Sequence, residues 1–495
     1  MNLPQSEHIA TVEGVEVDTR HWIGGQRVAS ATTFEDISPI DESVLAHVHA
    51  GTSVEVDAAV AAARAAFPAW AALPIGERAA ILRRVAEGIE ARIEDLAQVE
   101  TRDNGSLIRS HRRGVMPRVA MNFRAFADYA EHKLGHPDME VPGRGHRERV
   151  TYDPAGVVAI ITPWNAPLML ATWRIGPAMA AGNTIVVKPP EWAPLTASLL
   201  ADIMHEAGVP AGVFNVVQGT GVEAGAPLTA HPDINRLAFT GSVPTAGVIA
   251  KAAAENIVPL SYELGGKSPL VVFEDADLDL AVEIAVEQFD NAGQVCLKAA
   301  RMLVHESIAE EFTRRVVAGA EKLVQGDPRD EATDVSALIS RRHFDQISGF
   351  VERALADGAK PLLGGGPNDD LGGLYFRPTI LVGAPEDAEI MTEEVFGPVV
   401  TIQTFETEEE AVRKANDTRF GLAATLVTGD RDRAERVSAQ LEAGTVWVNC
   451  FFVRDLEAPF GGNKKSGIGR EGGLWSFDFY TDIKNSVFAP NGWSE

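Results

Sequence analysis

The sequence has few cysteines, no long apolar run and no basic leader. Its 495 residues include two cysteines, Cys296 and Cys450, and neither lies in a CxxC or mixed Cys/His pattern. A disulfide framework is therefore excluded, and we expect no metal site. No apolar run approaches the roughly 18 residues that a membrane-spanning helix needs. Residues 1–18 contain four acids and no basic stretch followed by an apolar one, so we expect a cytoplasmic location.

Basic residues are also scarce relative to acids. The net charge is −26, from 70 acidic and 44 basic residues. Such a field repels phosphate backbones and anionic lipids, so we expect neither nucleic acid nor membrane as a partner. The plainest interpretation is a surface that keeps the protein soluble. If the substrate is an anion, local arginines have to attract it.

The chain is too long for one hydrophobic core, and its patterns change along its length. Up to residue 150 the sequence reads mostly as helix, including one amphipathic helix over 75–99. Between 156 and 290, short β-branched runs alternate with helical segments, which predicts βαβ units and a parallel sheet. A second α/β region follows to about residue 473. The tail, 479–487, alternates weakly and could add a strand to a neighbouring subunit.

Three polar positions carry candidate chemistry, and each has a plainer alternative. Cys296 follows a polar, glycine-containing turn where a thiol can meet a substrate, although an isolated cysteine can equally be buried and inert. Glu263 precedes two glycines and could act as a general base, or serve as a helix cap or surface ion pair. Asn165 follows a predicted strand, where its amide could stabilise an oxyanion or simply form a turn.

These positions belong to seven motifs that occur in a familiar order. The motifs are TPWNAPL (162–168), VVKPPEWAP (186–194), FTGS (239–242), YELGGKSP (262–269), GQVC (293–296), EEVFGPV (393–399) and PFGGNKKSGIGREGG (459–473). Through them the chain resembles the aldehyde dehydrogenase superfamily from about His21 to Lys484. The resemblance implies NAD-dependent oxidation of a small-molecule aldehyde to a carboxylic acid.

The resemblance also implies the role of each site residue. Cys296 matches the nucleophile, Glu263 the base that hydrolyses a thioester, and Asn165 the side-chain half of the oxyanion hole, with the backbone N–H of Cys296 as the other half. Lys188 and Glu191 match the residues that hold the adenosine ribose, and Glu394 the carboxylate on the nicotinamide ribose. The remaining positions implied for the cofactor are Ile161, Thr162, Pro163, Trp164, Gly221, Gly241, Ser242, Leu264 and Phe396.

The identity of two residues bears on cofactor choice and on the active-site loop. The Glu191 carboxylate can accept hydrogen bonds from ribose hydroxyls but repels a 2′-phosphate, so NAD is favoured over NADP. After the nucleophile, relatives often have small residues, whereas this chain has Leu297-Lys298-Ala299-Ala300. Lys298 could therefore alter the substrate tunnel locally.

The substrate is predicted from a loop near the C-terminus. Residues 448–456 and 469–477 look most like the hydroxymuconic and aminomuconic semialdehyde dehydrogenases. Arg454 in that loop, with Arg118 on a predicted helix, could bind the carboxylate of an acid semialdehyde. Alternatively, both arginines make internal ion pairs, Arg454 with Asp455 or Glu457. Trp173 and Phe452, with Phe451, could instead form a pocket for an aromatic aldehyde.

The resemblance sets the expected architecture and assembly. We expect an α/β protein with a Rossmann-like parallel-sheet NAD-binding domain (1–133 and 152–262), an α/β catalytic domain (263–473) and a small β oligomerisation arm (134–151 and 474–495). A homodimer or homotetramer is expected. A CoA-acylating relative generally lacks the base that Glu263 matches. One alternative function is a general aliphatic or aromatic aldehyde dehydrogenase. Another, of a different class, is a non-catalytic structural or binding protein on this fold.

Overall fold

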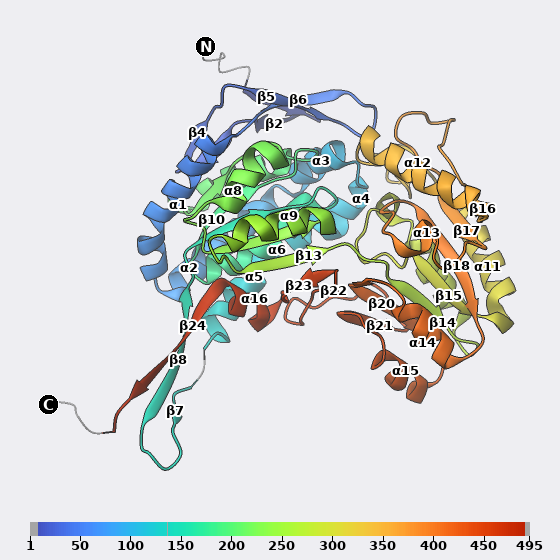
Figure 1. Ribbon diagram of the computed structural model, residues 1–495. Coiled ribbons are helices and arrows are strands. Elements are labelled where there is room, and N and C mark those ends of the chain that lie inside the picture. Colours follow the sequence, from blue (N-terminus) through green and yellow to red (C-terminus); the bar gives the residue numbers. More distant parts are fainter. Residues whose placement is uncertain (1–7, 136, 491–495) are drawn as a thin grey trace.

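Two largely parallel sheets, each flanked by helices, and a small antiparallel arm make up the fold (Figure 1). The structure is a computed structural model and describes residues 8–135 and 137–490. The predicted α/β class is confirmed. Within the described chain, no single helix is both long and apolar enough to cross a membrane, and α1 (Ser53–Ala72) and α2 (Ile75–Ala91) reach that measure only as a pair bent by 120°.

The first sheet has the order β23-β13-β12-β9-β10-β11-β3-β4. Its strands are β3 (His21–Ile23), β4 (Gln26–Val28), β9 (Val157–Ile161), β10 (Thr184–Lys188), β11 (Phe214–Val216), β12 (Arg236–Gly241), β13 (Leu260–Leu264) and β23 (Gly467–Ile468). The five central strands are parallel and mostly buried on both faces, which explains the β-branched composition of β9 and β10. Strand order reverses between β9 and β12, and a ligand crevice is expected beyond their carboxyl ends.

Helices cover both faces of this sheet. Besides α1 and α2, they are α3 (Ile93–Asn104), α4 (Ile108–Ser110), α5 (Met116–His132), α6 (Pro167–Ala180), α7 (Leu195–Glu206), α8 (Ala226–Ala230) and α9 (Val243–Ala254). The predicted single helix over 75–99 is wrong, because it breaks at Arg92 (φ −120°). The mostly helical reading up to 150 is also wrong before residue 50, where short strands pair as β1 (Ile9–Val12) with β2 (Val15–Asp18) and β5 (Thr33–Ile37) with β6 (Val44–His49).

The second sheet has the order β16-β17-β18-β15-β14-β20-β21. Its strands are β14 (Pro269–Val272), β15 (Arg301–His305), β16 (Lys360–Leu363), β17 (Thr379–Val382), β18 (Val399–Phe405), β20 (Ala423–Val427) and β21 (Thr445–Val448). Its helices are α10 (Leu278–Glu287), α11 (Glu306–Ala320), α12 (Arg341–Ala356), α13 (Glu389–Thr392), α14 (Glu408–Asn416) and α15 (Arg431–Ser438). The expected boundary between the NAD-binding and catalytic domains, at 262/263, falls inside β13. This strand pairs entirely within the first sheet.

The arm extends from the body of the protein (Figure 1). It consists of β7 (Met139–Glu140), β8 (Arg147–Pro154) and β24 (Thr481–Phe488), which follows α16 (Gly473–Tyr480). The tail strand β24 pairs antiparallel with β8 of the same chain, from Thr481 opposite Pro154 to Phe488 opposite Arg147. A short pair, β19 (Phe420–Gly421) with β22 (Asn463–Lys464), lies elsewhere, beside the glycine-rich C-terminal loop.

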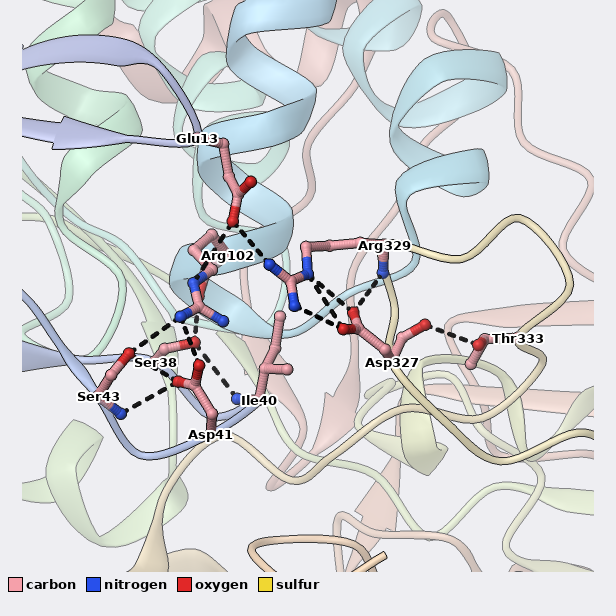
Figure 2. A network of polar contacts seen from close by, with 9 residues as sticks. All are labelled: Glu13, Ser38, Ile40, Asp41, Ser43, Arg102, Asp327, Arg329 and Thr333. Atoms are coloured by element: carbon pink, nitrogen blue, oxygen red, sulfur yellow. Dashed lines mark hydrogen bonds and ion pairs between the residues drawn. The ribbon is translucent and has the colours of Figure 1, made fainter.

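An ion-pair network ties the two sheet regions together on one side (Figure 2). Glu13, in the turn between β1 and β2, accepts a hydrogen bond from Arg329 at 2.9 Å and lies 3.6 Å from Arg102. Arg102 also pairs with Asp41 at 2.6 Å, and Arg329 with Asp327 at 2.6 Å. The network holds the 327–333 loop of the second region against α3 of the first.

Candidate active site

The loop that carries Cys296 has an unusual backbone that neighbouring groups hold in place. Asn291 and Ala292 adopt φ of 49° and 51°, a left-handed conformation that is costly for non-glycine residues. At Gly293, φ is +66°, and a Cβ would overlap the Gly397 backbone. Asn291 Nδ2 donates to the Asn165 carbonyl at 3.2 Å, and the side-chain oxygen of Gln294 accepts from the Ile339 N–H at 3.0 Å. The thiol therefore lies on a pinned loop.

The Asn165 amide reaches the same loop. Its Nδ2 donates to the Gln294 carbonyl at 3.0 Å, two residues before Cys296. An amide nitrogen has two donors, so one remains for a ligand oxygen. Burial, and then the Glu394 and Glu263 carboxylates, raise the pKa of the Cys296 thiol to about 12, and Arg454 opposes that rise. The thiol is thus protonated at neutral pH and needs help to ionise.

Glu263 is a buried carboxylate close to this thiol. It lies on β13 opposite Thr240 and Gly467, and is 8% exposed. Within the described chain, neither of its carboxylate oxygens has a hydrogen-bond partner. Burial, and then the charge of Glu471, hold the pKa of Glu263 well above its usual range, while Arg174 lowers it. A carboxylate with a raised pKa is a better proton acceptor at neutral pH.

Arg174 and Glu471 form a buried ion pair near Glu263 that sequence reasoning missed. Arg174 Nε lies 2.9 Å from Glu471 Oε1, and both side chains are almost fully buried. Burial also raises the pKa of the nearby Tyr480 hydroxyl, as does Glu471. Arg174 is the one charged residue in α6, which is otherwise mostly apolar. This position in the sequence could have indicated a buried cation that needs a partner. The partner lies far away in sequence, so the pair was not visible there.

A second carboxylate, Glu394, lies on the other side of the glycine pair. The Gly266 N–H donates to Glu394 Oε1 at 3.0 Å, and a Cβ at Gly265 would overlap the carboxylate. Burial raises the pKa of Glu394 to about 7, and the Gly266 N–H and the Lys298 and Lys267 ammonium groups oppose that rise. The ELGG turn after β13 therefore brings Glu263 and Glu394 to one site.

Near Glu394, the rings of Phe396 and Trp164 lie edge to face, and the His343 ring contacts both. The Phe396 and Trp164 ring centroids are 5.3 Å apart at 90°, and Phe396 has φ of 56°. His343, which the sequence did not single out, packs on Trp164 at 5.2 Å, and its Nε2 lies 2.9 Å from the Phe396 carbonyl oxygen. Burial lowers the pKa of His343 to about 4, so the ring is neutral at pH 7.

The positions matched to adenosine binding gather beyond the carboxyl ends of β9, β10, β12 and β13. Lys188 is 3% exposed, and its Nζ donates to Glu191 Oε2 at 2.9 Å. The pKa of Glu191 is lowered: its burial is outweighed by Lys188 and by backbone N–H groups, including that of Gly221. Ser242 caps α9 through the Thr245 N–H.

The other cofactor positions belong to the same edge of the sheet. Ile161 ends β9, and the next residue, Thr162, donates its N–H to the Lys188 carbonyl at 3.2 Å before Pro163 turns the chain. Gly241 pairs with Leu264 across β12 and β13. An ammonium and carboxylate pair suits a ribose diol, and a helix N-terminus suits a pyrophosphate. These residues therefore fit a dinucleotide, and no group of three or more potential metal ligands occurs in the described residues.

The two arginines meet at one indole ring. The Arg118 and Arg454 guanidinium carbons lie 5.5 and 5.2 Å from the Trp173 centroid, and that of Arg454 lies 3.7 Å from Phe460. Arg118 Nε donates to Asn122 Oδ1 at 3.2 Å. Burial, and then the charge of Arg454, lower the pKa of Arg118 to about 10. In the part of the chain that the structure describes, neither guanidinium lies within 4.0 Å of a carboxylate oxygen.

The internal ion pairs considered for Arg454 are absent from the described residues. Glu457 pairs with Lys133 at 2.5 Å, and Asp455 accepts the Glu457 N–H at 2.9 Å. Phe452 has φ of 58° and is 43% exposed, with its ring 5.7 Å from Phe451. An enclosed aromatic pocket around Phe452 is therefore poorly supported.

Comparison with known proteins assigns the chain. Residues 26–486 match the aldehyde dehydrogenase family. The 2-hydroxymuconic semialdehyde dehydrogenase of Pseudomonas sp. (strain CF600) is 47% identical over 94% of this chain and 99% of its own length. The 2-aminomuconic semialdehyde dehydrogenase of Danio rerio is 41% identical, over 94% and 97%.

A solved structure gives the same assignment. Betaine aldehyde dehydrogenase from Staphylococcus aureus, in complex with NAD+, superposes with a TM-score of 0.93 at 37% identity and covers 97% of this chain and 96% of its own. Agreement of sequence and fold over nearly the whole chain leaves one conclusion. This protein belongs to the aldehyde dehydrogenase family and is an oxidoreductase that oxidises aldehydes.

Proposed function

We propose that the protein oxidises an aldehyde through a covalent thioester on Cys296. The Cys296 thiol loses its proton to solvent, and its sulfur forms a bond to the carbonyl carbon as the C=O π bond breaks. The Asn165 amide with the Cys296 N–H stabilises the resulting oxyanion. NAD, when bound, supplies the acceptor for the hydride that leaves this carbon. Loss of the hydride re-forms the C=O bond and leaves the acyl group on sulfur, so the substrate carbon is oxidised by two electrons.

Glu263 then acts as the base for hydrolysis. It takes a proton from a water molecule whose oxygen attacks the thioester, and the C–S bond breaks to release a carboxylic acid and Cys296. The raised pKa of Glu263 and its unpartnered oxygens support this role, because a buried base without competing hydrogen bonds is ready for a water. A non-catalytic role for the fold would not explain why a buried carboxylate lies close enough to Cys296 to raise the pKa of its thiol.

NAD is the proposed cofactor, and NADP is disfavoured. Lys188 and Glu191 would hold the adenosine ribose, the N-terminus of α9 beside Gly241 and Ser242 the pyrophosphate, and Glu394 the nicotinamide ribose. Ile161, Thr162, Pro163, Trp164, Gly221, Leu264 and Phe396 complete the lining. The Glu191 side chain is 38% exposed, so a 2′-phosphate would meet a carboxylate that keeps its charge.

The substrate is proposed to be an acid semialdehyde of the muconic type. The observation that carries this is the pair of guanidiniums on Trp173: neither makes an ion pair among the described side chains, although the charges of Glu263 and Glu471 act on Arg454 and that of Asp455 acts on Arg118. Both guanidiniums are half-buried, and cations withdrawn from water are normally paired, so a bound anion is the proposed partner. The names of the two relatives above point the same way. A general aliphatic or aromatic aldehyde, bound against Trp173, is the second candidate.

The remaining proposals concern domains and assembly. Residues 1–133 and 152–262 would form the NAD-binding domain, 263–473 the catalytic domain, and 134–151 with 474–495 an arm for a homodimer or homotetramer. Strand β24 lies at the edge of its sheet and exposes Ile483 and Val487, which supports pairing with another copy. Sedimentation showing a stable, fully active monomer at micromolar concentration would contradict this assembly.

A substrate panel tests the function. Short aliphatic, aromatic and carboxylate-bearing aldehydes are compared with NAD and with NADP, without CoA, by following NADH absorbance. The proposal expects NADH from all classes, the highest kcat/KM for the acid semialdehyde, and a preference for NAD. No NADH without CoA would refute the hydrolytic mechanism. Equal kcat/KM for charged and neutral aldehydes would refute the substrate assignment alone.

A further inference from the structure

Lys298 is a buried cation two residues after the nucleophile. It is 5% exposed, in a loop where most neighbours are small or apolar. Burying an ammonium is unfavourable unless its donors find acceptors. Burial lowers its pKa to about 7, and the Glu394 carboxylate raises it. The proposed reaction gives Lys298 no chemical step, so its burial needs another explanation.

The Lys298 side chain crosses to the segment that follows Glu394. Its Nζ donates to the backbone carbonyl of Gly397 in a short hydrogen bond, and to that of Val399 at 3.2 Å. The two segments also pack closely at the backbone, because Gly293 has no Cβ to overlap Gly397. One side chain thus connects the loop of Cys296 to the start of β18.

The segment that Lys298 holds is strained at Phe396. A left-handed φ of 56° is unfavourable for a bulky side chain and persists only where surrounding contacts fix it. The structure provides two such contacts on successive peptides. The neutral His343 lies 2.9 Å from the Phe396 carbonyl oxygen, and Lys298 donates to the Gly397 carbonyl. Together they hold Phe396 edge to face with Trp164 and keep Glu394 beside Gly266.

We infer that Lys298 is a positioning residue that fixes the Glu394–Phe396 segment against the Cys296 loop and thereby sets the affinity for NAD. The inference rests on the proposed function, because that assigns Glu394 and Phe396 to the nicotinamide side of NAD. Lys298 touches neither cofactor nor substrate in this scheme. It acts by holding the Gly397 and Val399 carbonyls. Without these hydrogen bonds, the strained backbone at Phe396 would relax and its ring would move away from Trp164.

The test measures cofactor binding rather than turnover. Lys298→Met keeps the length of the side chain but removes every donor, and Lys298→Gln keeps a neutral donor. Binding of NAD to cofactor-free protein is measured by calorimetry, and the reactivity of Cys296 by its rate of alkylation with iodoacetamide. We expect Lys298→Met to raise the Kd for NAD by about 10-fold or more, as loss of a charge-assisted hydrogen bond suggests. Lys298→Gln should raise it less.

Lys414, on α14, offers a matched control because it bonds to the same strand, β18. Its Nζ donates to the Thr404 carbonyl at 2.8 Å, near the far end of β18, and its side chain is also largely buried. Lys414→Met should lower thermal stability without changing the Kd for NAD. The alkylation rate of Cys296 should stay within about twofold of wild type in all three variants, because its pKa has no large contribution from either lysine.

The outcomes separate this inference from the proposed function. If Lys298→Met binds NAD as tightly as wild type, the inference is wrong. It is also wrong if Lys414→Met weakens NAD binding equally, since that would indicate a general effect of stability. If Lys298→Met does not fold, Lys298→Gln decides, and an unchanged Kd there overturns the inference. Wild-type protein that binds no NAD would instead overturn the proposed cofactor.

Discussion

Around Cys296 the nearest ionisable groups are mainly carboxylates, whereas around Trp173 they are guanidiniums. At the thiol end, Glu263 is buried and Glu394 is half-buried, and both raise the pKa of Cys296. At the other end, Arg118 and Arg454 share one indole ring, and burial and then the charge of Arg454 lower the pKa of Arg118. The two ends thus have opposite charge within one site.

These opposite charges predict how a substrate with two functional groups would be oriented. A carboxylate is repelled from the thiol end and attracted to the guanidinium end, so the aldehyde carbon of an acid semialdehyde would face Cys296. Arg454 belongs to both ends, because it also lowers the pKa of Cys296 and of Glu263. Arg118 is not among the groups that change the pKa of Cys296. The two arginines should therefore behave differently when replaced.

The largest effect should come from breaking the thiol end itself. Cys296→Ala is expected to abolish aldehyde oxidation and leave NAD binding nearly intact, because no other group at this end can form the covalent bond. Oxidation is followed by NADH absorbance and binding by calorimetry. Cys450→Ser is the matched thiol control and should keep most of its activity. Appreciable turnover by Cys296→Ala, once wild-type contamination is excluded, would remove the nucleophile role.

Replacing the base should slow one half of the reaction. Glu263→Gln is expected to give a stoichiometric burst of NADH followed by turnover about 10²- to 10⁴-fold slower than wild type, because hydrolysis loses its base while acylation does not. An acyl adduct on Cys296 should appear in the intact mass. Fast acylation with neither burst nor adduct would show that hydrolysis proceeds without Glu263.

The thiol end was more predictable from sequence than its surroundings. Strands β9 and β10 are buried on both faces and read as β-branched runs that end in proline or polar residues, so the motifs at their ends could be placed. Strand β13 (Leu260–Leu264) has no β-branched residue and was not predicted as a strand. The strands before residue 50 were missed because they are short, half-exposed and partly charged, as in Thr33–Ile37. The helix break at Arg92 has no glycine or proline to mark it.

The parts of the site that were missed depend on tertiary contacts. The Arg174–Glu471 pair and the contact of His343 with Phe396 each join segments far apart in sequence, and nothing local requires either. The same holds for Lys298, whose partners lie about a hundred residues away, at Gly397 and Val399. Local patterns identify which residue types occur at a strand end. They do not identify which charged groups are buried together.

The guanidinium end is tested by a smaller and selective loss. Arg118→Ala should lower kcat/KM for an acid semialdehyde by about 30- to 1000-fold, since about 2–4 kcal/mol is lost when a desolvated carboxylate is half paired. A neutral aldehyde of similar length should react almost as before. Arg118→Lys should recover only part, because an ammonium lacks the planar fork of donors.

Arg454→Ala tests whether this arginine acts at both the guanidinium end and the thiol end. It should show the selective loss and, in addition, a loss common to charged and neutral aldehydes, because removing this cation raises the pKa of the Cys296 thiol. Kinetic constants for both substrates are measured with each variant. Equal losses for both substrates in Arg118→Ala would mean that the arginines support the tunnel, and the acid semialdehyde assignment would then fail.

The smallest effect should come from removing a charge behind the thiol end. Glu471 raises the pKa of Glu263, second only to burial, and Arg174 lowers it. Deacylation needs deprotonated Glu263, so hydrolysis speeds up as pH rises through the pKa of that group. Glu471→Gln removes the like charge and frees Arg174 to attract Glu263, and both changes lower this pKa.

The half-maximal pH for deacylation should therefore move down by about 1 unit, with the limiting rate at high pH little changed. The profile is measured by single-turnover hydrolysis of the acyl-enzyme across pH 5–9, and thermal melting checks that the buried Arg174 has not unfolded the variant. A purely structural role for Glu471 would lower the rate equally at every pH. A shift to higher pH would mean that Glu471 assists the base, and the electrostatic contrast drawn between the two ends would then be wrong at Glu263.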